Sequence, residues 1–97
     1  MWRTNMWSKI KEATTALFGH GHVEFLEMGK AIVGVANAEQ GFKDPRLIQL
    51  FDVLQEGLPQ GGVLSIHHRQ PKVIFIAGTD RRLVSQIELQ RGFREAA

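Results

Sequence analysis

The sequence predicts a small α+β domain of three helices, a β-hairpin and a C-terminal helix in one chain of 97 residues. Apolar residues recur every three or four positions over three long segments, which is typical of amphipathic helices. After the third segment come two short runs rich in β-branched residues, separated by a turn, as in a hairpin. We interpret residues 1–97 as a single domain, because domains usually contain about 50 to 250 residues.

Composition excludes several classes of protein. Hydrophobic residues make up 43% of the chain and charged residues 23%, which is inconsistent with a disordered or collagen-like chain. Cysteine is absent, which excludes disulfides, thiol catalysis and thiolate metal sites, and we expect a cytoplasmic protein. No run approaches the ~18 apolar residues that a membrane-spanning helix needs, so we expect no membrane partner.

The first helix is expected to begin near Met6 or Trp7, with residues 1–5 loosely ordered. Its apolar positions recur at helical spacing, and the Gly19-His20-Gly21 cluster should end it.

The segment 23–36 fits two structures. Phe25, Met28, Ile32 and Val35 follow one another at intervals of three and four, which favours a helix. Gly29 and Gly34, together with the abundance of Val and Ile, favour strands. We expect a helix, and the alternative is a hairpin over 23–36 that completes a four-stranded antiparallel sheet.

The third helix has the clearest signals. Asp44 can cap its N-terminus, Pro45 suits the first turn, and Gly57 follows the last apolar position. Its buried stripe should include Phe51 and Leu54.

The runs 63–67 and 72–77 should form the hairpin, with a turn around residues 68–71. The second run is apolar on both faces, so we expect protein on both sides of it and a buried Phe75. Thr79 is expected to cap a last helix over residues 80–95.

Catalytic and metal-binding residues are not indicated. Ser65 and His67 share a strand face, but the sequence places no acid beside them to orient the imidazole, so we expect no enzyme and no cofactor. His20, His22 and His67 are weak candidates for metal ligands. Because neighbouring strand residues point to opposite faces, His67 and His68 cannot both join such a site. We expect no metal site.

Positive charge is concentrated near the C-terminus. Residues 1–66 hold six Lys/Arg against seven Asp/Glu, whereas residues 67–97 hold six against three. All six of these basic residues are candidates for binding a partner or phosphate: Arg69, Lys72, Arg81, Arg82, Arg91 and Arg94.

These observations favour a non-catalytic, regulatory protein-binding module, such as an adaptor, assembly component or small inhibitor, that binds an acidic protein through its basic C-terminal third. The doubly apolar strand has an edge that needs covering, so a homodimer is expected as well.

The alternative function is DNA or RNA binding. The predicted order of elements resembles a winged-helix domain, which would place helix 44–56 in the major groove and use the 68–72 turn as the wing. Asp44, Asp52 and Glu56 on that helix would repel phosphate, so protein binding remains the preferred prediction.

Overall fold

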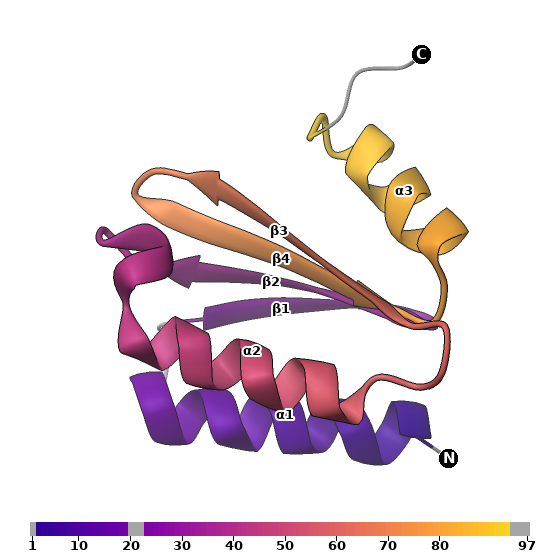
Figure 1. The fold of residues 1–97 in the computed structure, drawn as a ribbon, viewed down its shortest axis with the longest axis horizontal. Coiled ribbons are helices and arrows are strands. Elements are labelled where there is room, and N and C mark those ends of the chain that lie inside the picture. Colours follow the sequence, from indigo (N-terminus) through magenta and orange to yellow (C-terminus); the bar gives the residue numbers. More distant parts are fainter. Residues whose placement is uncertain (1, 20–22, 94–97) are drawn as a thin grey trace.

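The computed structural model describes residues 2–19 and 23–93, with side chains from Ser8 onward (Figure 1). In chain order the elements are α1 (Trp2–Phe18), β1 (Val23–Met28), β2 (Ala31–Asn37), the 3-10 turn η1 (Gly41–Lys43), α2 (Pro45–Gly57), β3 (Val63–Arg69), β4 (Lys72–Gly78) and α3 (Arg81–Gln90). The predicted α+β class is confirmed. The helix α1 begins at Trp2, so it includes four of the five residues expected to lie before it.

The four strands form one antiparallel sheet in the order β1-β2-β4-β3. β2 and β4 lie in the middle, and they are the two most apolar strands because both of their faces are covered by protein. The predicted cover on both sides of β4 is confirmed, since Phe75 and Ile76 face opposite sides of the sheet and are each fully buried. β1 and β3 are the edge strands.

The helix expected over residues 23–36 is wrong, and the alternative hairpin forms instead. Gly29 has a φ of +63°, which a glycine adopts without strain, and this allows the chain to reverse between β1 and β2. The apolar spacing was misleading because β2 is buried on both faces, so its sequence lacks the alternation that is typical of a strand. In the hairpin these apolar residues do not share one face: Phe25 and Ile32 pack on one side of the sheet, whereas Met28 packs on the other.

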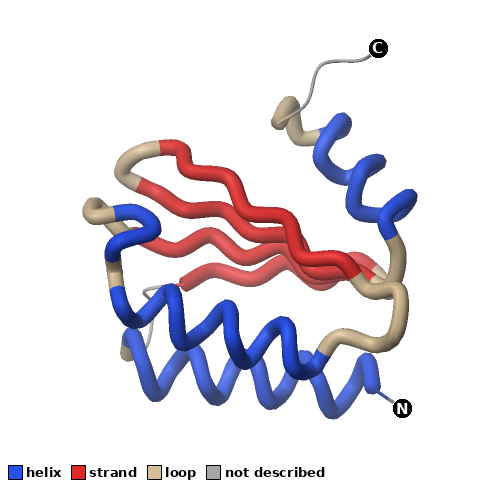
Figure 2. The backbone as a smooth tube through the Cα atoms, in the orientation of Figure 1, coloured by secondary structure: helices blue, strands red, loops and turns tan. Residues whose placement is uncertain are grey.

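The two faces of the sheet carry different helices (Figures 1 and 2). α1 and α2 lie side by side on one face, where Ile10, Leu47, Leu50 and Leu54 bury against the sheet around Phe75. α3 packs on the opposite face through Val84 and Ile87, next to Val33 and Ile76. The expected burial of Leu54 and Phe75 is confirmed, while Phe51 is only half-buried.

The predicted start of α2 is confirmed. The carboxylate of Asp44 accepts a hydrogen bond of 2.9 Å from the backbone N–H of Arg46, and Pro45 occupies the first helical position. The Arg46 guanidinium also donates to both oxygens of Asp44, at 3.0 and 2.7 Å. These hydrogen bonds hold the pKa of the Asp44 carboxyl below its ordinary value, because they stabilise its charged form.

Both predicted ends of the last helix are corrected. Asp80, not Thr79, caps α3: its carboxylate accepts from the backbone N–H of Leu83 at 2.8 Å, whereas the Thr79 N–H donates to the Lys30 carbonyl. The helix stops at Gln90 rather than near residue 95. Gly92 adopts a φ of +78°, and the Phe93 N–H donates back to the Glu88 carbonyl at 2.8 Å, which closes the helix.

The resemblance to a winged-helix domain depended on a helix over residues 23–36. Those residues form strands, and α2 is followed by a hairpin that belongs to a four-stranded sheet. The order of elements therefore gives no support to the winged-helix interpretation.

Candidate functional site

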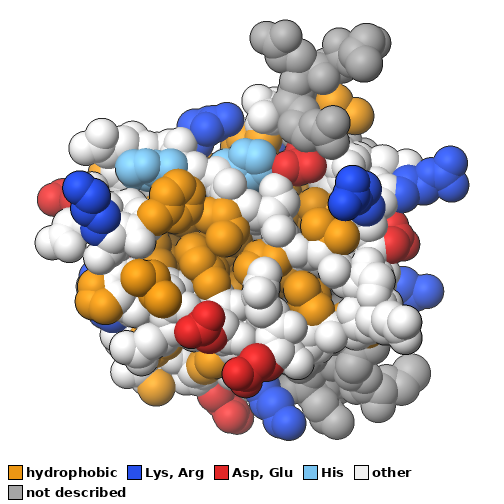
Figure 3. All heavy atoms as spheres, viewed as in Figure 1, with side chains coloured by type: hydrophobic (Ala, Val, Ile, Leu, Met, Phe, Trp, Pro, Cys, Tyr) orange, Lys and Arg blue, Asp and Glu red, His pale blue; other side chains and the backbone are white. Residues whose placement is uncertain are grey.

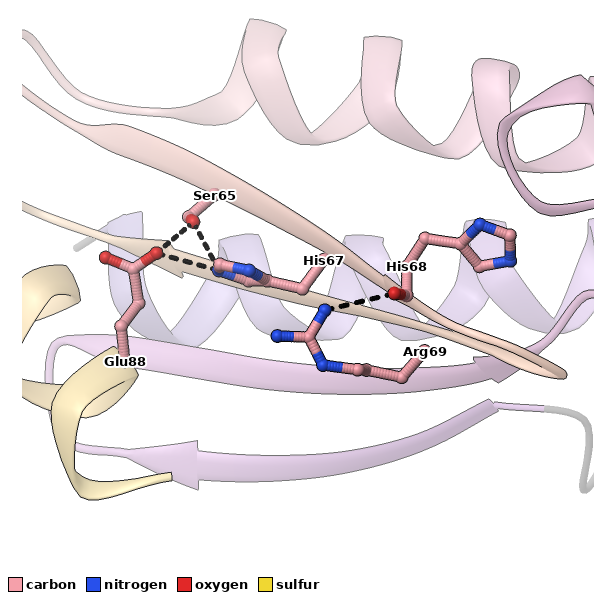
Figure 4. A network of polar contacts seen from close by, with 5 residues as sticks. All are labelled: Ser65, His67, His68, Arg69 and Glu88. Atoms are coloured by element: carbon pink, nitrogen blue, oxygen red, sulfur yellow. Dashed lines mark hydrogen bonds and ion pairs between the residues drawn. The ribbon is translucent and has the colours of Figure 1, made fainter. Parts of the chain in front are cut away.

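A polar cluster links β3 to α3 and brings together Ser65, His67 and Glu88 (Figure 4). Glu88 Oε2 lies 2.6 Å from Ser65 Oγ and 2.7 Å from His67 Nε2, and Ser65 Oγ lies 2.9 Å from the same Nε2. The Glu88 side chain is 10% exposed and that of His67 is 16% exposed. The strand places Ser65 and His67 on one face because they are two residues apart.

Glu88 is the acid that sequence reasoning did not find. It comes from another element, more than twenty residues after Ser65, so no local motif connects the two. One signal was present in the sequence: Glu88 follows Val84 by four residues and Ile87 by one, which places a carboxylate on the buried stripe of α3.

The cluster has the residue types of a catalytic triad but not its geometry. In a triad the acid binds one imidazole nitrogen and the serine binds the other. Here Ser65 and Glu88 both approach Nε2 of His67. Since a carboxylate only accepts hydrogen bonds, Nε2 must carry the proton, and it then has no lone pair to receive a proton from Ser65. The Ser65 hydroxyl donates to Glu88 instead. These hydrogen bonds connect α3 to strand β3.

Aromatic contacts also connect β3 to Phe93, which follows the end of α3. The His67 ring stacks on Phe93 with centroids 4.9 Å apart, and the Arg69 guanidinium lies 5.5 Å from the Phe93 ring. A cleft of about 250 Å³ remains between α3 and β3, lined by Val63, Leu64, Ser65, Arg81, Ser85 and Glu88 among others.

The basic candidates fall into two groups at opposite ends of the β3–β4 hairpin. Arg69 and Lys72 are paired across the two strands at the turn. Arg81 and Arg82 begin α3, just after β4 ends. β4 runs from Lys72 to Gly78, a span of roughly 20 Å at ~3.3 Å per residue, so one subunit holds two basic patches rather than one.

The four basic residues of these patches are exposed, and no carboxylate in the described part of the chain forms an ion pair with any of them. Arg91 is also exposed, at the end of α3, whereas Arg94 lies outside the described residues.

His67 and His68 lie on opposite faces of the sheet. His67 faces α3, whereas His68 points to the other side, where its ring contacts Phe42 with centroids 5.5 Å apart. The prediction that these neighbours point to opposite faces is confirmed. His20 and His22 lie outside the described residues, and no group of three or more metal-binding side chains occurs among the residues described.

A second surface was not predicted from the sequence. β3 pairs only with β4 in the described chain, and apolar side chains gather beside its free edge, over β3 and α2 (Figure 3). We call this the edge surface and define it by Phe42, Ile48, Phe51, Leu64 and Ile66. Phe42 is 48% exposed and Ile48 is 52% exposed, and the other three are half-buried. An apolar surface of this kind, continuous with an open strand, is typical of an interaction site.

None of the described helices is long and apolar enough to cross a membrane. The chain matches no known protein family, no curated protein and no solved structure.

Proposed function

We propose that this protein is a non-catalytic protein-binding module whose basic C-terminal third binds an acidic protein. The observation that carries the proposal is the set of exposed cations, Arg69, Lys72, Arg81 and Arg82, with no carboxylate partner in the described chain. Arg81 and Arg82 also occupy the first turn of α3, where the helix dipole disfavours positive charge. An acidic partner would relieve this unfavourable placement.

The polar cluster supports the non-catalytic part of the proposal. Ser65, His67 and Glu88 hydrogen-bond to one another, and the hydroxyl of Ser65 donates its proton to the carboxylate of Glu88. A serine nucleophile usually gives its proton to an imidazole with a free lone pair, which His67 does not offer in this arrangement. The acceptor of the Ser65 proton is instead a carboxylate, which is ordinarily a much weaker base than an imidazole.

The experiment is affinity capture from cell lysate with the tagged protein, with and without nuclease. We expect a protein partner that survives nuclease treatment and is lost when Arg81→Glu and Arg82→Glu are combined. Exposed charge changes alter stability by ~0.5 kcal/mol or less, so the variant should fold normally. The control is Lys9→Glu with Lys11→Glu, which reverses two exposed cations of α1, outside the C-terminal third and outside the edge surface, and should retain the partner.

Loss of the captured protein on nuclease treatment would instead show that the cations bind nucleic acid. Equal retention by the two double variants would place the interface elsewhere on the molecule.

A further inference from the structure

The two edges of the sheet differ in their protection against pairing with another chain. β1 carries Glu24 and Glu27, both exposed, and Glu27 forms an ion pair with Lys11 of α1. Charged side chains of this kind keep an edge strand from pairing with another strand. β3 has no acidic residue, lysine or proline, and its first charged residue is Arg69 at its last position. β3 is therefore the edge that is open to pairing.

The apolar residues beside β3 come from a helix as well as from the strand. Ile48 and Phe51 are three residues apart, so they lie on the same side of α2. Arg46 lies against the Phe18 ring of α1, 4.5 Å from its centroid, which identifies the opposite side of α2 as the one that borders β3. Phe51 agrees with this placement: its half-exposed ring contacts Phe75, which is paired with Ile66 of β3, and Phe51 and Ile66 pack against the same core.

An open strand next to an exposed apolar side of a helix indicates which kind of molecule binds at the edge surface. A single added strand would pair with β3 but would leave Ile48 and Phe42 exposed on the helical side. A second copy of this chain presents a strand and a helix in the same relative position, so it covers both at once. Symmetric pairing of one surface with itself is also the commonest way in which proteins form dimers.

We propose that two copies of this chain pair through β3 and α2 about a two-fold axis near Ile66, the middle residue of the strand. The two β3 strands run antiparallel and join the sheets into one of eight strands. Ile66 then faces Ile66 of the second copy, with Phe51 of each copy beside it.

Charge on α2 agrees with this arrangement. Lys43 precedes the helix, whereas Asp52 and Glu56 are exposed in its second half. Because the two-fold axis makes the α2 helices antiparallel, the cationic start of one helix lies beside the acidic second half of the other. Opposite charges therefore meet at both ends of the helical contact.

The dimer also joins the two basic patches. Antiparallel pairing places Arg69, at the end of one β3, beside Val63, at the start of the other. Arg81 lines the same cleft as Val63, so Arg69 of one copy approaches Arg81 of the second. Each dimer then has two composite basic surfaces, each built from both chains. This part of the inference rests on the proposed function, since an acidic partner would bridge the composite surface.

Sedimentation velocity on the full chain tests the inference. We expect wild-type protein at twice the monomer mass of 10.9 kDa. Ile48→Glu, which changes an exposed helical residue, should shift the protein to monomer and weaken self-association at least tenfold. The matched control is Leu89→Glu, which changes an exposed leucine of α3 and should stay dimeric. Wild-type protein that sediments as a monomer at every concentration would overturn the proposal, as would equal dissociation of both variants.

Arg69→Glu separates this inference from the proposed function. It replaces the contact between Arg69 and Arg81 of the second copy with an opposite-charge contact, so it should strengthen the dimer severalfold. The same change removes a cation from the basic surface, so it should weaken binding of labelled poly-L-glutamate. Weaker self-association of Arg69→Glu would contradict the two-fold pairing while leaving the proposed function intact. Unchanged poly-L-glutamate binding would count against the basic surface alone.

Discussion

Phe75 is the largest fully buried side chain among the described residues. Its side chain is fully buried in the central strand β4, and its ring makes edge-to-face contacts with Phe25 and Phe51, at centroid distances of 6.1 and 5.9 Å. The same ring fills the space above Gly34 of β2, where a Cβ atom would overlap it. A glycine in a central strand is explained here by the size of its neighbour.

We therefore predict that Phe75→Ala lowers the free energy of unfolding by about 3 to 5 kcal/mol, because a buried aromatic ring is replaced by a cavity. This is a large part of the stability of a domain of this size. Denaturant titration followed by circular dichroism measures it. Leu89→Ala, at an exposed site, is the control and should unfold near the wild-type midpoint. A near-native midpoint for Phe75→Ala would contradict the central position of β4.

Asp44 contributes stability that depends on pH. Hydrogen bonds from the Arg46 guanidinium and backbone N–H hold the pKa of Asp44 below the value that it has in the unfolded chain, about 3.9. The contribution is therefore fully present above that value, and it is lost as the pH falls through the lower pKa of the folded state. Asp44→Ala should cost about 1 kcal/mol at pH 7, which is typical of a lost helix cap.

Thermal melts of wild type and Asp44→Ala across the acid range test this prediction. The two melting temperatures should differ at neutral pH and converge below the pKa of Asp44. A difference that persists in strong acid would show that the carboxylate is not the source of the stability. Glu39→Ala, at an exposed position nearby, should show no such convergence.

At the scale of elements, α3 is attached to the sheet by few groups, and Glu88 is the central one. It accepts hydrogen bonds from both Ser65 and His67, which are themselves partly buried. Without it, Ser65 and His67 can hydrogen-bond only to each other, so one of the two donors loses its acceptor, at a cost of about 1 to 3 kcal/mol.

Hydrogen exchange of Glu88→Ala should therefore show faster exchange in α3 than in wild type, with the centre of the sheet unchanged. Gln86→Ala, at an exposed position of the same helix, is the control. Wild-type exchange rates in α3 of Glu88→Ala would mean that the packing of Val84 and Ile87 holds the helix without the polar cluster.

The sequence predicted correctly those helices and strands whose positions are determined by neighbouring residues, such as caps and turns. The cap at Asp44 with Pro45 located α2, and the turn expected around residues 68–71 located the β3–β4 hairpin, although β3 continues to Arg69. The segment 23–36 could not be assigned in this way, because a strand buried on both faces loses the alternation that identifies strands. The β2 strand is apolar because β1 and β4 flank it and helices cover both its faces, which is a property of the assembled sheet.

The candidate site was only partly predictable for the same reason. The basic residues could be read directly, but their division into two patches follows from the length of β4. Glu88 joins Ser65 and His67 only because α3 returns across the sheet after β4. The edge surface follows from the strand order, which puts β3 at the rim of the sheet, where Leu64 and Ile66 pack against the same core as Phe51 of α2.

At the scale of the whole molecule, we propose that charge and apolar surface serve different steps of recognition. In this proposal the exposed cations at both ends of the β3–β4 hairpin attract an acidic partner, through contacts that weaken with ionic strength. The edge surface would bind a second copy and bring the cations of two chains together. Such a dimer would explain why one chain holds two half-surfaces, about one strand length apart.

Fluorescence anisotropy of labelled poly-L-glutamate tests the central claim most directly, because it measures recognition of acidic polypeptide by the purified protein. We expect wild type and the Lys9→Glu, Lys11→Glu control to bind alike, with affinity that falls as salt is added. Arg81→Glu with Arg82→Glu should bind at least fivefold more weakly, which corresponds to about 1 kcal/mol. Equal affinity of all three proteins at low salt would contradict the claim that the C-terminal cations form the binding surface.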